Sequence, residues 1–147
     1  MRVRSLRLGR RPGATVPETA VVIGIFLTLL LAVFEYGRFV MIRHLVDNAA
    51  REGARLAVVS TNTLTTQDIQ DEVTNRLAGQ QLSGLSIDVY KSDAAGNNTG
   101  VWSDAAFGEP ICVSVTGTYS PMLPTFGFLH NPVNVPAKII MRSEANI

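Results

Sequence analysis

Residues that could do chemistry are few in this sequence. It has two histidines and one cysteine, namely His44, His130 and Cys112. The histidines stand far apart, with no cysteine or carboxylate motif around them. The sequence also lacks HExxH, GxSxG and a phosphate-binding glycine loop. We therefore expect no enzyme activity, no metal site and no cofactor, and we interpret Cys112 as a small buried residue.

One carboxylate stands where a charge is costly. Glu18 comes five residues after Gly13, at the start of the most apolar stretch, and five arginines precede it: Arg2, Arg4, Arg7, Arg10 and Arg11. A charge in hydrocarbon costs a few kcal/mol even on lenient scales, so the position of Glu18 needs a reason. A local interpretation is a capping box with Thr15 as N-cap and Glu18 at N3.

The element that positions Glu18 is a predicted transmembrane helix over residues 14–42. Residues 20–34 are uncharged, and the flanks supply the length of about 20 residues that a span requires. Glu35 and Arg38 share a helix face and are expected to pair near the outer boundary. The arginine-rich start predicts a cytoplasmic N-terminus. Three interpretations compete: a cleaved signal peptide, whose small-x-small site is poor here, a plain membrane anchor, and processing ahead of the helix.

The same helix is expected to continue to about residue 59. Asp47–Arg51 and Glu52–Arg55 have the spacing of helical ion pairs. One face of this helix consists of small residues that allow close packing: Ala49, Ala50, Gly53, Ala54 and Ala57. Either the domain's own sheet or a helix from a neighbouring subunit could cover this face.

Residues 43–147 are predicted to form an α+β domain. We expect a short helix at about 66–78 and antiparallel strands at about 85–91, 111–120 and 133–142, the last an edge or bulged strand because of Pro136. In the loop at 92–110, Trp102 and Phe107 are either anchors against the sheet or exposed recognition residues. From His44 onward the chain has six Lys/Arg and ten Asp/Glu without a basic cluster, which argues against a nucleic-acid partner.

The N-terminal third resembles a known family. The basic leader, Gly13, Glu18 and the apolar helix resemble a type IV prepilin signal, although Pro17 directly before Glu18 is a departure. The stretch EYGRFVMIRHLVDNAAREGARLAVV, with Ala-Ala-Arg-Glu-Gly-Ala-Arg at residues 49–55, resembles the TadE-like pseudopilins of tight-adherence (Tad) pilus systems.

The resemblance implies a fold, a location and partners. It implies a long pilin-like helix packed on a small antiparallel sheet, with the N-terminus cytoplasmic and the domain outside the cytoplasmic membrane. A prepilin peptidase would cut between Gly13 and Ala14, and Glu18 would then meet the N-terminal ammonium of a neighbouring subunit. The partners would be membrane lipid, other pilin subunits and the assembly machinery. The alternative function is a single-pass, membrane-anchored binding domain that uses the Trp102 loop.

Overall fold

The computed structural model describes residues 15–61, 63–80, 82–122 and 132–144. By contacts the chain divides into two compact units, Met1–Phe34 and Glu35–Ile147. The expected leader at residues 1–13 and most of the irregular stretch at 121–132 lie outside the described residues.

The longest element is helix α1, Thr15–Val59. Pro17 lies in its first turn, where a missing backbone N–H removes no intrahelical hydrogen bond. The helix crosses without interruption from an exposed apolar stretch into the buried core of the C-terminal unit. A single uninterrupted helix was expected from the spacing of apolar residues.

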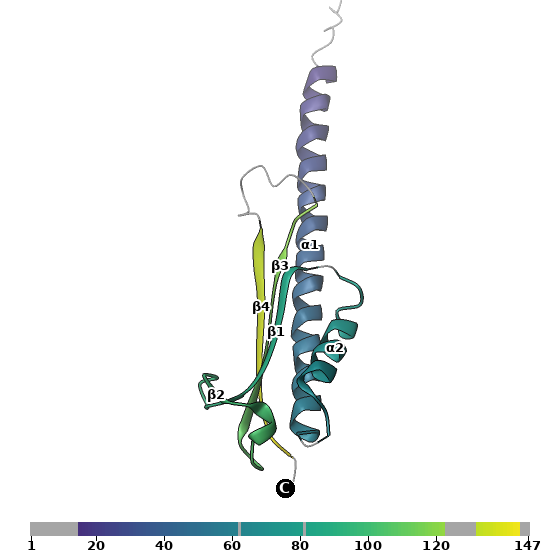
Figure 1. Ribbon diagram of the computed structural model, residues 1–147. Helices are drawn as coiled ribbons and strands as arrows, with labels where there is room; N and C mark the ends of the chain where they lie inside the picture. Colours follow the sequence, from purple (N-terminus) through teal and green to yellow (C-terminus); the bar gives the residue numbers. More distant parts are fainter. Residues whose placement is uncertain (1–14, 62, 81, 123–131, 145–147) are drawn as a thin grey trace, which may run out of the picture. The chain divides into compact units, whose positions relative to one another are not determined.

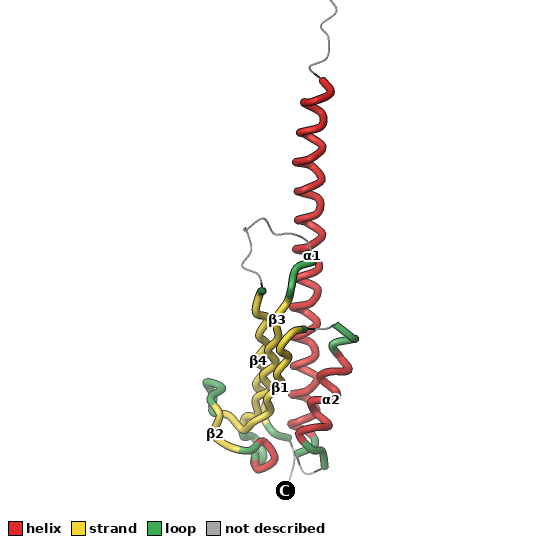
Figure 2. The backbone as a smooth tube through the Cα atoms, turned by 45° about the horizontal axis from the view of Figure 1, so that its top comes forward, coloured by secondary structure: helices red, strands yellow, loops and turns green. Residues whose placement is uncertain are grey.

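The sheet of the C-terminal unit has four antiparallel strands in the order β2-β1-β3-β4. Its strands are β1 (Ser83–Ser92), β2 (Asn98–Gly100), β3 (Pro110–Tyr119) and β4 (Val133–Arg142). Strand β4 lies at the edge of the sheet. An edge strand tolerates Pro136, because the N–H that proline lacks does not have to pair with a further strand. Figure 1 shows the sheet beside the C-terminal half of α1, and Figure 2 shows the same arrangement from a second direction.

Helix α2, Thr66–Arg76, begins with a complete capping box. The backbone N–H of Thr65 donates to the Asp68 carboxylate at 2.8 Å, and the Asp68 N–H donates to Thr65 Oγ1 at 3.3 Å. The Thr65 hydroxyl also donates to the same carboxylate at 2.7 Å. The Thr65 N–H and this hydroxyl together hold the pKa of Asp68 below its ordinary value. The helix stops before Ala78 and Gly79, which both have positive φ.

The core lies between α1, α2 and one face of the sheet. Burial alternates along most of β3, which turns Ile111, Val113 and Val115 inward against the helices. Cys112 of β3 is also fully buried, and the facing helices contribute further fully buried side chains: Val46, Ala49, Ala50, Ala54, Ala57, Ile69 and Val73. The protein is therefore an α+β fold with a long N-terminal helix and one short additional helix.

Two elements in the loop after β1 were not expected. Strand β2 is only three residues long, and a turn of 3₁₀ helix, η1, spans Trp102–Asp104. A three-residue strand gives almost no period-two signal, so it was included in the predicted loop. Strand β1 is also longer than the expected 85–91, beginning at Ser83.

Candidate membrane segment and assembly site

The first part of α1 is an exposed apolar rod. Among the described residues one helix is long and apolar enough to cross a membrane, and the most apolar part of it has a mean hydropathy of 2.2 and no buried residue. Every side chain from Val16 to Phe34 is exposed. At 1.5 Å per residue these nineteen residues measure about 28 Å, close to the hydrocarbon thickness of a bilayer.

Glu18 lies in the first turn of α1 and is exposed. A carboxylate there is favoured by the positive end of the helix dipole. The expected processing residues Gly13 and Ala14 lie outside the described residues, as does the side chain of Thr15. The structure thus places Glu18 at the helix start, while the processing site and the Thr15 capping box stay predictions.

A buried polar cluster stands where the exposed rod ends. Glu35 is only 8% exposed and accepts hydrogen bonds from the Tyr119 hydroxyl and, at 3.3 Å, from the Met122 N–H. The Arg38 guanidinium lies over the Tyr119 ring, 5.4 Å from its centroid, and the Phe39 ring contacts Tyr119 at 5.7 Å. Burial, together with the hydrogen bond to Glu35, raises the pKa of Tyr119 to about 12. The cluster joins the end of β3 to α1.

The Glu35–Arg38 ion pair expected from helical spacing is not among the ion pairs of the described residues. The reason is tertiary: the hydroxyl of Tyr119, 84 positions away in sequence, takes the carboxylate instead. Arg38 stacks on that ring, and its buried Nη1 makes no hydrogen bond to any described residue.

The small-residue face of α1 is covered within the chain. Ala49, Ala50, Ala54 and Ala57 are fully buried. A Cβ atom on Gly53 would lie 2.5 Å from Val73 Cγ2 on α2 and 3.6 Å from Val113 Cγ1 on β3. Of the two expected occupants, the chain's own α2 and sheet therefore lie against this face. The absence of a side chain at residue 53 lets three elements meet at one point.

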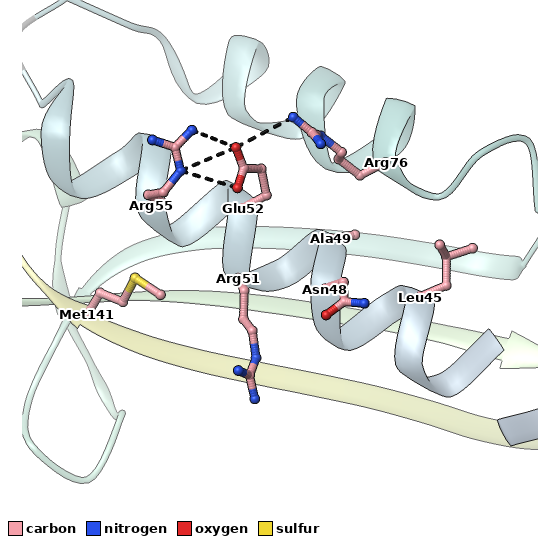
Figure 3. A pocket seen from close by; sticks show the side chains of 8 residues that line it. All are labelled: Leu45, Asn48, Ala49, Arg51, Glu52, Arg55, Arg76 and Met141. Atoms are coloured by element: carbon pink, nitrogen blue, oxygen red, sulfur yellow. Dashed lines mark hydrogen bonds and ion pairs between the residues drawn. The ribbon is translucent and has the colours of Figure 1, made fainter. Parts of the chain in front are cut away.

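Beside this buried face α1 carries an open groove, shown in Figure 3. The groove has a volume of about 460 Å³ and is lined by Leu45, Asn48, Ala49, Arg51, Glu52, Arg55, Arg76 and Met141. Glu52 pairs with Arg55 at 2.6 Å and with Arg76 of α2 at 3.5 Å. The hydrogen bond from Arg55 holds the pKa of Glu52 below its ordinary value. The Glu52–Arg55 pair predicted from spacing is confirmed.

Arg51 differs from the other two arginines of the groove. Figure 3 shows its side chain directed away from the Glu52 cluster. The Asp47–Arg51 pair predicted from spacing is not among the ion pairs that the described residues form. Sequence reasoning missed the groove because Arg76 and Met141 reach it from distant parts of the chain.

The two aromatic residues of the loop after β1 have different environments. Trp102 is 2% exposed, and its indole N–H donates to Thr66 Oγ1 at 2.9 Å. Phe107 is 67% exposed. Trp102 is therefore an anchor that ties the loop to the start of α2, and it is not available for recognition. The alternative function, a binding domain that uses this loop, stays a prediction, with the exposed Phe107 and not Trp102 as its candidate recognition residue.

The described residues contain no group of three or more His, Cys, Asp or Glu side chains that could hold a metal ion. Cys112 is buried in β3, as its strand-like surroundings predicted.

Comparison with known proteins gives one match. Residues 13–55 match the family model of the TadE-like proteins. Neither the curated proteins nor the solved structures contain a match to the chain. The matched segment begins at Gly13, contains Glu18 and the exposed apolar rod, and ends at Arg55 of the Ala-Ala-Arg-Glu-Gly-Ala-Arg stretch. The resemblance to TadE-like proteins is therefore confirmed over residues 13–55.

Proposed function

We propose that this protein is a minor pilin or pseudopilin that supports assembly of a Tad-type pilus used in adhesion or secretion. The observation that carries the proposal is the extent of the TadE-like match, from Gly13 to Arg55. One segment then holds, in order, a processing point, an acidic residue, a membrane helix and the buried helix of the extracytoplasmic domain.

The proposed membrane span is Val16–Phe34, shorter than the 14–42 expected from hydropathy. From Glu35 onward α1 makes contacts inside the C-terminal unit, with Ile42 buried and Phe39 packed against the core. Those side chains are not free to face lipid. The five leading arginines hold the N-terminus in the cytoplasm, so the C-terminal unit lies outside the cytoplasmic membrane.

The proposed processing step is cleavage by a prepilin peptidase between Gly13 and Ala14. It makes Glu18 the fifth residue of the mature chain and creates a new ammonium group at Ala14. A carboxylate at the membrane edge is tolerated when a cation pairs with it. The exposed position of Glu18 in the first turn of α1 supports pairing with the ammonium of a neighbouring subunit.

Intact-mass measurement of protein extracted from membranes tests the processing step. In cells that contain the peptidase we expect a mature chain that begins at Ala14, and we expect Gly13→Leu to leave the full-length chain in the membrane. Gly24→Ala is the matched control, because a Cβ atom there meets nothing within 4 Å. Wild-type protein that keeps its first thirteen residues would refute the proposal.

Glu18→Gln tests the assembly role, because it keeps the shape and can still accept a hydrogen bond. We expect normal cleavage and membrane level, with weaker crosslinking between subunits. Capping alone is worth about 1 kcal/mol, too little for a severe assembly defect. If Glu18→Gln assembles like wild type, and lowers stability as much as Thr15→Ala does, capping is its whole role.

A further inference from the structure

The groove lined by Arg51, Arg55 and Arg76 has an excess of positive charge. These three arginines face one lining carboxylate, Glu52, while Glu72 of α2 also pairs with Arg76 at 2.6 Å. Leu45 supplies an apolar surface. We propose that this groove binds the acidic first turns of α2 from a second copy of the chain. The inference rests on the proposed function, because it gives the assembling subunit a specific contact with its neighbour.

Arg55 and Arg76 are held in place by ion pairs, but their guanidinium groups can still bind a further anion. Glu52 receives hydrogen bonds from Nε and Nη2 of Arg55, yet the side chains of Arg55 and Arg76 stay 60% and 56% exposed. Exposed ion pairs of this kind are weak, so an incoming carboxylate can share their arginines. Arg51 makes no ion pair among the described residues and is free to bind directly.

The place of the groove along α1 argues for a protein partner. It begins at Leu45, ten residues and about 15 Å after Glu35, where α1 becomes buried in the C-terminal unit. Arg55 lies a further ten residues along. The polar headgroup layer outside the hydrocarbon is only about 5–8 Å thick. With the membrane boundary at Glu35, a lipid phosphate does not reach the groove.

The complementary surface lies on the same chain. Asp68 and Asp71 stand one turn apart at the start of α2, and both are exposed. Hydrogen bonds from Thr65 hold the pKa of Asp68 low, so this carboxylate is ionised at neutral pH. Asp71 accepts only the amide of Gln67, at 2.9 Å, among the described contacts. Two carboxylates one helical turn apart can each pair with one guanidinium group of the groove.

The test measures self-association of the full-length protein in detergent micelles, by sedimentation over a range of concentrations. We expect Arg51→Glu and Asp71→Arg each to weaken association by about tenfold or more, because each places like charges in contact. A mixture of the two variants should associate again, since opposite charges then face each other. Arg43→Glu and Asp104→Arg are charge-matched controls at exposed positions outside both surfaces, and should behave like wild type.

Three results would overturn the inference. The first is that the wild-type protein stays monomeric at every concentration. The second is that Arg51→Glu and Asp71→Arg both associate as strongly as the wild type. The third is an effect of Arg51→Glu without any effect of Asp71→Arg, which would show that the groove takes a different partner. Unchanged thermal midpoints exclude misfolding as the cause. Processing between Gly13 and Ala14 is measured separately, so failure here leaves the proposed function standing.

Discussion

Gly53 offers the sharpest test of the packing between α1 and α2. A methyl group at this position would lie 2.5 Å from Cγ2 of Val73, which is fully buried and β-branched, so it cannot easily turn aside. Overpacking of a tight core costs about 1–3 kcal/mol. Replacing glycine by alanine inside a helix gains about 1 kcal/mol. We expect Gly53→Ala to lower the free energy of unfolding by up to about 2 kcal/mol, and Gly53→Leu to lower it further.

The same helix supplies the control. A Cβ atom on Gly37 meets nothing within 4 Å, so Gly37→Ala should show the helix-propensity gain alone. Denaturant unfolding of the detergent-solubilised full chain measures both variants. Trp102 is the only tryptophan and is buried, so its fluorescence reports unfolding of the C-terminal unit without interference from the apolar rod.

A double-mutant cycle isolates the contact itself. In a Val73→Ala background the atom that clashes is gone, so Gly53→Ala should become neutral or stabilising. The sign of the alanine effect is thus expected to reverse. If Gly53→Ala is as stable as Gly37→Ala in the wild-type background, the close contact between position 53 of α1 and Val73 of α2 is refuted.

Three further predictions concern hydrogen bonds of the C-terminal unit. Tyr119→Phe should lower the free energy of unfolding by about 1–3 kcal/mol in denaturant titrations, because the buried Glu35 carboxylate loses a donor. The pKa of Tyr119 is raised from 10.0 to about 12 in the folded state, so the contribution of its protonated hydroxyl to stability is complete below pH 10 and is lost toward pH 12. Over that range the free energy of unfolding of Tyr119→Phe should fall less steeply with pH than that of the wild type. Equal slopes for the two proteins would contradict this prediction. Thr65→Ala should cost about 1 kcal/mol in the same assay, and Asp68→Ala should add little to it, because both break one capping box; full additivity would show that the box is not a unit.

Local patterns predicted most of the elements. The spacing of apolar residues along α1 and the alternation in β3 each repeat over many turns or pairs, so the signal accumulates. The start of α2 was also predictable, because Thr65 and Asp68 form a cap from neighbouring residues. Strand β2 was missed because its three residues make only a short irregular pairing with β1.

Tertiary contacts limited what could be said of the site. Helical spacing pairs Glu35 with Arg38, but no local rule brings the Tyr119 hydroxyl to that carboxylate. The burial of Trp102 likewise depends on Thr66, 36 positions away. The expected end of the membrane span at residue 42 stays a prediction. Hydropathy cannot distinguish a side chain that faces lipid from one that is buried in the C-terminal unit, as Ile42 is.

The cluster at Glu35 also has a mechanical meaning. Under the proposed function, the C-terminal unit is pulled while lipid holds the apolar rod, which puts the chain between them under tension. Because α1 is one continuous helix, that tension travels along its backbone into the C-terminal unit, where Glu35 is the first residue to hold another element, through Tyr119 and the Met122 N–H. These bonds cross between α1 and the end of β3, so a pull along the helix loads them in shear, together with the apolar contacts beyond them. The cluster is therefore the first contact that resists separation of the sheet from α1. Tyr119→Phe should lower the force at which the two separate.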